Sequence, residues 1–135
     1  MWIKLLVVGK LKESYWRDQA QEMLQTLRKR CRIEVIEIED EPDRDIARAI
    51  RVESEGVLQR VAPTDHVILF DLAGKPADRF FRLSSDRVNT IVIGGSNGVD
   101  DSIRRRADAS IALTPMTLPH QLVRIVALDM IIRRL

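Results

Sequence analysis

The residues best suited to chemistry lie in the last third of the chain. The motif Thr117–His120 ends in a histidine, and Arg124 comes four residues later. Residues four apart lie on one face of a helix, so an imidazole and a guanidinium would sit one turn apart. An imidazole can take up a proton near neutral pH, and a guanidinium can bind an anion. The alternative is structural, since a histidine at a helix start with an arginine below it often serves only the fold.

A glycine-rich loop follows the apolar run that ends at Ile93. Its glycines are Gly94, Gly95 and Gly98. Glycine permits positive φ angles and lets a ligand approach the main chain, which suits a flat polar group such as an adenine or a ribose. The spacing matches neither the dinucleotide-binding fingerprint nor a phosphate-binding loop. The alternative is that this loop only turns the chain.

The elements that must position these residues alternate between strand and helix. Short apolar or alternating runs predict strands at Trp2–Val8, Arg32–Ile38, His66–Asp71 (closed by the turn residues Ala73–Pro76), Thr90–Ile93 and Ser110–Leu113. Helical spacing predicts helices at Ser14–Arg30, about Asp43–Arg60, a short one around Phe80, Asp100–Ala107 and Pro119–Arg134. This order predicts one α/β domain over residues 1–135, an α/β/α sandwich with a largely parallel sheet.

Ligands of open parallel sheets bind beyond the carboxyl ends of the strands. Three loops of this chain should meet there: the one after Phe70-Asp71, the loop Gly94–Gly98, and the segment Leu113–Leu118 that leads into Pro119-His120. The last helix is apolar around most of its circumference, so it should be buried on more than one side. We therefore expect a homodimer with this helix at the interface.

Composition limits the other possibilities. The 135 residues carry 22 basic and 20 acidic side chains, a net charge of +2, so any RNA-binding surface must be local. Basic residues cluster at Arg28–Arg30, Arg104–Arg106 and Arg133-Arg134, which could meet phosphates or simply be solvated. One cysteine and two histidines predict no metal site, and no apolar run is long enough for a membrane span. We expect a cytoplasmic protein.

The sequence resembles the small SPOUT-class methyltransferases that modify N3 of a pseudouridine in 23S ribosomal RNA. The resemblance runs over nearly the whole chain and is carried by Val7–Lys12, Gly74-Lys75, Ile93–Gly98, and Met116–Gln121 followed by Arg124. It implies a trefoil knot in the carboxyl-terminal half, a homodimer through the last helix, and S-adenosylmethionine as the methyl donor. It also implies 23S rRNA in the ribosome as the partner.

The resemblance also assigns roles to residues. It places the cofactor at Phe70, at the glycine loop and along the last loop, which consists of Leu113, Thr114, Pro115, Met116, Thr117 and Leu118. The ring nitrogen that accepts the methyl group must lose a proton, and His120 is the best candidate to assist that loss. Arg124 could stabilise negative charge on the base or hold a phosphate.

Two features depart from the family pattern. The last helix of relatives continues into a tail with adjacent tyrosine and histidine, whereas the present sequence ends at Leu135, and the region Phe80–Asn89 is shorter than usual. Cofactor binding should survive these departures better than catalysis. The alternatives to an rRNA methyltransferase are therefore a cofactor-binding SPOUT dimer with impaired or no catalysis, and a SPOUT methyltransferase that acts on tRNA.

Overall fold

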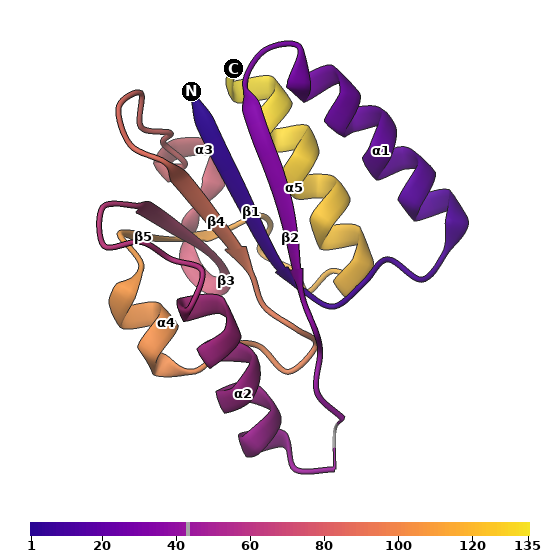
Figure 1. Cartoon of the computed structure of the whole chain (residues 1–135), viewed down its shortest axis with the longest axis vertical. Helices are drawn as coiled ribbons and strands as arrows, with labels where there is room; N and C mark the ends of the chain where they lie inside the picture. Colours follow the sequence, from indigo (N-terminus) through magenta and orange to yellow (C-terminus); the bar gives the residue numbers. More distant parts are fainter. Residues whose placement is uncertain (43) are drawn as a thin grey trace.

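The structure is a computed structural model that describes residues 1–42 and 44–135. Its strands are β1 (Trp2–Val8), β2 (Arg32–Ile38), β3 (His66–Pro76), β4 (Asn89–Ile93) and β5 (Ala109–Ala112). Its helices are α1 (Ser14–Arg28), α2 (Ile46–Leu58), α3 (Ala77–Phe80), α4 (Asp101–Arg106) and α5 (His120–Arg134) (Figure 1). Each of them corresponds to an element that the sequence predicts.

The strands form one sheet in the order β2-β1-β4-β3-β5, and every pair of neighbours is parallel. Successive strand residues point to opposite faces, so each strand contributes to two cores. On one face, Leu5 of β1 belongs to the cluster that includes Leu27 of α1 and Leu128 of α5. On the other face, Leu6 belongs to the cluster that includes Val57 of α2. The predicted α/β/α sandwich is confirmed.

The path of the chain brings distant segments to one edge of the sheet. After β5, which lies at one end of the strand order, the chain passes through residues 113–119 into α5. Helix α5 packs against α1, on the side of the sheet that α1 covers (Figure 1). The last loop therefore crosses from the β5 side of the sheet to the end of β1. The trefoil knot remains a prediction.

Strand β3 is longer than the sequence predicts. The prediction ended it at Asp71, with Ala73–Pro76 as a turn, but the strand continues to Pro76 with a shift of register, so that Phe70 and Lys75 both pair with Ile111. Gly74 explains the difference, because a Cβ atom there would lie 2.6 Å from the carbonyl carbon of Ser110. Without a side chain, the backbone can approach β5 closely enough to resume pairing.

Capping residues set the helix ends. The Asp45 carboxylate accepts a hydrogen bond of 3.1 Å from the backbone N–H of Arg48, so α2 begins at Ile46. The predicted start at Asp43 lies outside the described residues. Helix α4 begins after Asp100, whose side chain accepts from the N–H of Ser102. No helix in the described part of the chain combines the length and apolar character needed to span a lipid bilayer.

A buried aspartate ties three strands together near the amino ends of the sheet. Asp65, just before β3, is 2% exposed and lies 3.0 Å from the ammonium of Lys4 on β1. It also accepts a hydrogen bond of 2.9 Å from the hydroxyl of Thr90 on β4. Desolvation raises the pKa of Asp65, but hydrogen bonds from the Ala62 N–H, Lys4 and Thr90 outweigh it and hold the pKa below its ordinary value.

Asp108, just before β5, is exposed but is likewise held by several donor groups. Its carboxylate accepts a hydrogen bond of 2.8 Å from the Val67 N–H and lies 3.4 Å from the guanidinium of Arg106. Desolvation raises the pKa of Asp108, but the Val67 N–H and the charges of Arg106 and Arg87 outweigh it, so the pKa is lowered.

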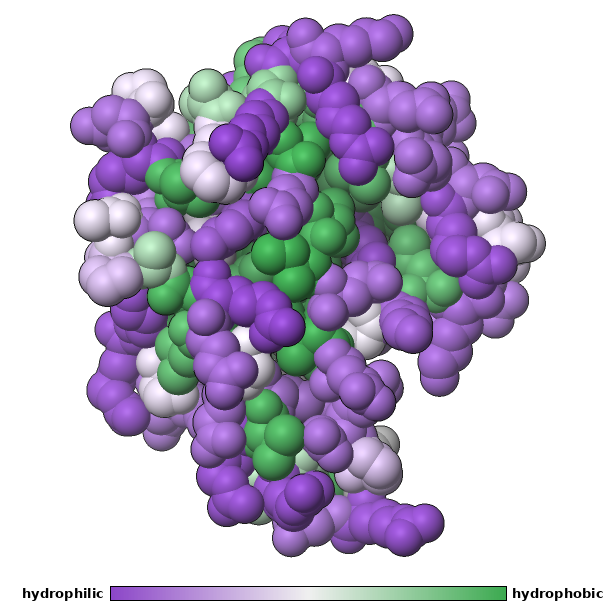
Figure 2. All heavy atoms as spheres, in the orientation of Figure 1, coloured by the Kyte–Doolittle hydropathy of each residue, from purple (hydrophilic) through white to green (hydrophobic). Residues whose placement is uncertain are grey.

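Figure 2 shows that hydrophilic side chains cover most of the face seen in Figure 1, with hydrophobic side chains visible mainly along its middle. Most large hydrophobic side chains are enclosed between the helices and the sheet. Among the exposed ones, Leu72 lies in the second half of β3, and Met116 lies in the loop that follows the edge strand β5. This placement directs attention to the carboxyl ends of the strands.

Candidate active site

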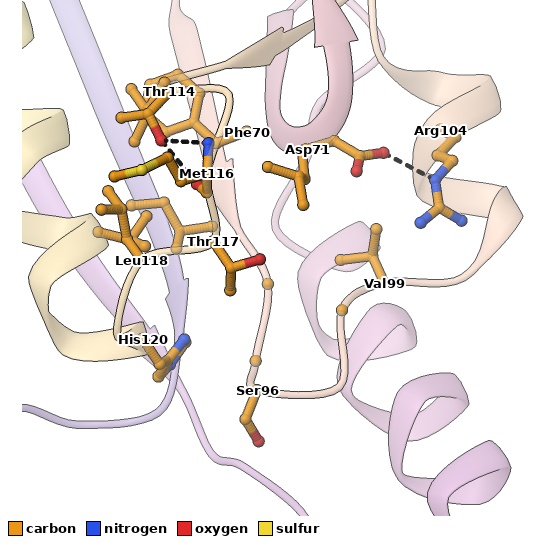
Figure 3. A pocket seen from close by; sticks show the side chains of 17 residues that line it. Phe70, Asp71, Ser96, Val99, Arg104, Thr114, Met116, Thr117, Leu118 and His120 are labelled. Carbon is orange, nitrogen blue, oxygen red and sulfur yellow. Dashed lines mark hydrogen bonds and ion pairs between the residues drawn. The ribbon is translucent and has the colours of Figure 1, made fainter.

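One cavity of about 270 Å³ lies at the carboxyl ends of the strands (Figure 3). All three segments that the sequence singles out contribute to it, although the one after Phe70-Asp71 continues as strand β3 and does not form a loop. The expected site residues that line it are Phe70, Gly94, Gly95, Gly98, Leu113, Thr114, Met116, Thr117, Leu118 and His120. Pro115 and Arg124 are not among the lining residues. Segments separated by at least 14 residues in sequence are thus brought to one ligand-sized space.

The glycines shape one wall of this cavity for two different reasons. A Cβ atom on Gly94 would lie 2.8 Å from Cγ1 of Val99, and one on Gly95 would lie 2.9 Å from Oε1 of Glu53. Side chains at these positions would therefore collide with the structure behind the loop. Gly98 has open space around it but a φ of +85°, which other residues rarely adopt.

The opposite wall is the loop between β5 and α5. The Thr114 hydroxyl accepts a hydrogen bond of 3.0 Å from the Met116 N–H and lies 2.6 Å from the Met116 carbonyl oxygen, which fixes the turn. Within the described chain, the backbone N–H groups of Thr117 and Leu118 make no hydrogen bond. They are therefore available to acceptor atoms of a ligand.

Several lining residues were not singled out by the sequence. They are Leu72, Ile93, Ser96, Val99, Arg104 and Val123. Arg104 donates a hydrogen bond of 2.9 Å to Asp71 and another to Asp101. The hydrogen bond to Asp71 raises the pKa of the Arg104 guanidinium although desolvation opposes it. Only the tertiary structure shows that α4 directs this arginine at Asp71 in β3.

The basic clusters are partly neutralised by such pairs. In the cluster Arg104–Arg106, Arg104 is paired with Asp71 and Arg106 with Asp108. Among the described residues, Arg105 makes no ion pair. Two of the three guanidiniums therefore have protein partners, and this cluster offers less free charge to RNA than its sequence indicates.

His120 opens helix α5 and is fixed by the end of β1. Its Nε2 lies 3.1 Å from the carbonyl oxygen of Val8. A carbonyl oxygen can only accept, so in the neutral ring Nε2 carries the proton and Nδ1 keeps a lone pair. Figure 3 shows His120 and Ser96 together at one end of the cavity, away from the Asp71–Arg104 pair. His120 can therefore accept a proton at that end.

Arg124 lies one turn further along α5, inside the protein. It is 7% exposed, and its guanidinium is 2.7 Å from the Glu37 carboxylate and 3.0 Å from the carbonyl oxygen of Gly9. His120 and Arg124 therefore hold adjacent carbonyls, those of Val8 and Gly9, at the end of β1. The structure places Arg124 behind the site, where it anchors the start of α5 to β1 and β2.

A parallel sheet with a ligand-sized cavity across its carboxyl ends, built from glycine and backbone-rich loops, is typical of α/β proteins that bind nucleotide-like cofactors. A family model described as "Predicted SPOUT methyltransferase" matches residues 1–135. The chain therefore belongs to the SPOUT methyltransferase family and is an enzyme of the methyltransferase class.

Curated relatives agree with this assignment. The chain is 35% identical to a ribosomal RNA large subunit methyltransferase H of Leuconostoc citreum, over 98% of this chain and 92% of the relative. It is 34% identical to the protein of that name in Caldicellulosiruptor saccharolyticus, over 97% of this chain and 92% of the relative. It is 37% identical to that of Ruminiclostridium cellulolyticum, with 98% and 92% covered.

S-adenosylmethionine is the methyl donor of this family, and the cavity suits it. The unpaired N–H groups of Thr117 and Leu118 can bind the edge of an adenine, while Leu113 and Leu118 supply apolar walls. The cavity volume is close to the lower end of the range of small-molecule sites, roughly 300–1,000 Å³. The residues present therefore fit the cofactor.

Proposed function

We propose that this chain transfers a methyl group from S-adenosylmethionine to a base in the RNA of the large ribosomal subunit. The match to relatives of that name, over nearly the full length of both chains, carries this proposal. The resemblance described above makes N3 of a pseudouridine in 23S rRNA the acceptor atom. This substrate implies that the enzyme works in the cytoplasm, on the ribosome.

The cofactor, when bound, supplies an electrophilic methyl group on a sulfonium. Residues of this chain must hold it in line with the ring nitrogen and accept the proton that the nitrogen releases. We assign the proton transfer to Nδ1 of His120, because the Val8 carbonyl holds the proton on the other ring nitrogen. The new N–C bond replaces the S–C bond, and the N–H proton leaves to His120.

We assign the cofactor contacts to the cavity walls. The glycine loop with Gly94, Gly95 and Gly98 would face one side of the adenosyl group, and the loop from Leu113 to Leu118 would face the other. Phe70 would close the base of the site. We assign Arg124 a positioning role, because its guanidinium is already bound by Glu37 and Gly9.

We propose a homodimer through α5. Leu122 and Val126 lie one turn apart on this helix, are partly exposed, and do not belong to either core cluster of the described chain. An apolar stripe outside the core is suited to burial against a second copy of the same helix. The dimer would place two candidate sites in one molecule.

Labelled S-adenosylmethionine tests the proposed reaction. Incubation with ribosomes, or with 23S rRNA from a strain that lacks the modification, should transfer label to a single pseudouridine. RNA that already carries the methyl group is the control and should take up none. Cofactor binding without transfer to any RNA would overturn catalysis and favour the binding dimer. Transfer only to tRNA would overturn the substrate.

A further inference from the structure

A second cavity, of about 560 Å³, adjoins the cofactor cavity. The two share Gly95, Ser96 and His120 as lining residues. Its volume lies within the range of small-molecule sites, roughly 300–1,000 Å³. A molecule in the second cavity would therefore touch the histidine that also borders the first.

One rim of this cavity presents two free lysines. Lys10 and Lys12 are exposed, and neither makes an ion pair among the described residues. The backbone that carries them is held in place, because Arg17 donates hydrogen bonds to the carbonyls of Leu11 and Lys12. Gln121 accepts a further bond of 3.2 Å from the Lys12 N–H. These ammonium groups thus extend from a fixed backbone, which suits phosphate binding.

The other walls suit an uncharged, flat group. Trp16 lines the cavity as a half-buried aromatic side chain packed on the core, and aromatic rings stack on nucleobases. Four carboxylate side chains line it as well, those of Glu13, Asp40, Glu41 and Glu53. Carboxylates repel phosphate, but they accept hydrogen bonds from N–H groups, which uracil-type bases carry. The cavity therefore offers ammonium groups for phosphate, at Lys10 and Lys12, and stacking and hydrogen-bonding groups for a base.

We propose that the second cavity binds the acceptor nucleotide of the RNA, turned out of its stack. The base would lie between Trp16 and His120, and the flanking phosphates would lie at Lys10 and Lys12. Enzymes that react with a base in structured RNA must expose it in this way. The proposal rests on the proposed function, since it names the place of that reaction's substrate.

Charge removal at the rim tests the phosphate contacts. In the double variant Lys10→Gln, Lys12→Gln, the KM for RNA should rise about tenfold, and the slope of log KM against log salt concentration should fall by about 1.4, for two lost contacts. The Kd of S-adenosylmethionine, measured by calorimetry, should not change. The double variant Arg28→Gln, Lys29→Gln removes the same charge at the far end of α1 and should leave the slope unchanged.

Fluorescence tests the base contact without requiring turnover. The chain has two tryptophans, and Trp2 lies under the Arg32 guanidinium at the start of β1. Binding of a short RNA that contains pseudouridine should quench the emission of Trp16. In Trp16→Phe, the remaining emission of Trp2 should not respond to this RNA.

The outcomes separate this proposal from the proposed function. One outcome would overturn the nucleotide site alone. In it, the double lysine variant transfers methyl groups with an unchanged KM for RNA, and RNA does not quench the emission of Trp16. A raised Kd for S-adenosylmethionine with an unchanged RNA KM would also overturn it, because the cavity would then hold part of the cofactor. Absence of methyl transfer by the unaltered protein, with quenching of Trp16 retained, would overturn the reaction and leave the RNA site standing.

Discussion

At the scale of single residues, His120 depends on one hydrogen bond to the Val8 carbonyl, which determines its free ring nitrogen. The substitution His120→Gln keeps a donor for that carbonyl, but an amide side chain cannot act as a general base. We expect kcat to fall by about 10²–10⁴-fold. The Kd of S-adenosylmethionine should stay within about twofold, because general-base loss acts on the chemical step.

The second histidine provides the control. His66 at the start of β3 lies 3.2 Å from the carbonyl oxygen of Arg82, far from the cavity. His66→Gln should leave kcat unchanged in single-turnover methyl transfer. If His120→Gln kept full activity, the histidine would have no part in proton removal.

Arg124 is expected to act on stability and position. Arg124→Ala would remove the bonds to Glu37 and to the Gly9 carbonyl, and should lower the free energy of unfolding by about 2 kcal/mol. Because α5 would be less firmly attached to β1, the kcat should fall as well. Urea denaturation measures the first effect.

Arg133→Ala on the same helix is the matched control, since the pair that Arg133 forms with Asp129 is exposed to solvent. It should not move the urea midpoint measurably. If Arg124→Ala abolished RNA binding in a fully stable protein, Arg124 would contact the substrate directly and the positioning role would be wrong.

At the scale of elements, the irregular pairing of β3 with β5 depends on Gly74. In Gly74→Ala, the new Cβ atom would lie 2.6 Å from backbone atoms of Ser110 and Ile111, so the strands would have to separate. We expect a loss of about 1–3 kcal/mol in unfolding free energy. Amide exchange should also become faster at residues 110–112. Ala73→Ser, at the exposed neighbouring position, should show neither effect.

Most elements could be predicted from the sequence because their signals are local. β1 and β2 have the bounds that the apolar runs predict, and α5 begins within one residue of the expected start. The end of β3 could not be predicted. Whether Gly74 makes a turn or a close approach depends on Ser110 and Ile111, which are more than 30 residues away.

At the scale of the whole molecule, acid should destabilise the fold through two hydrogen-bonded carboxylates, one buried and one exposed. Asp65 and Asp108 both have pKa values below the ordinary 3.8. A carboxylate whose pKa is lowered by folding stabilises the folded state fully at pH values above its pKa in the unfolded state. This stabilisation is lost as the pH falls through its pKa in the folded state. The urea concentration at the midpoint of unfolding should therefore decrease as the pH is lowered from about 5 to about 1.

Substitution separates this contribution from general acid effects. Asp65→Asn should lower the midpoint at neutral pH and flatten its fall in acid, because the group that titrates is gone. Asp18→Asn, at an exposed position on α1, should leave the urea midpoint unchanged at every pH. An acid profile of Asp65→Asn identical to that of the unaltered protein would show that Asp65 contributes nothing to it.

The proposed homodimer interface at α5 also belongs to the scale of the whole molecule. Val126→Asp would place a charge on the outward stripe of α5, and the protein should sediment as a monomer. Ile46→Asp introduces the same charge at an exposed apolar position on α2 and should remain dimeric. If both variants and the unaltered protein sedimented alike, α5 would not be the interface.

The sequence alone determined the alternation of strands and helices, the sandwich, the three segments that line the cavity, and the family. These follow from local periodicity, glycine and short motifs. Only the tertiary structure decided that Arg124 is bound inside the protein, that Arg104 turns toward Asp71, and that Lys10 and Trp16 border a second cavity beside His120. The reason is physical: whether a charged side chain is free or paired depends on partners that folding brings from distant parts of the chain.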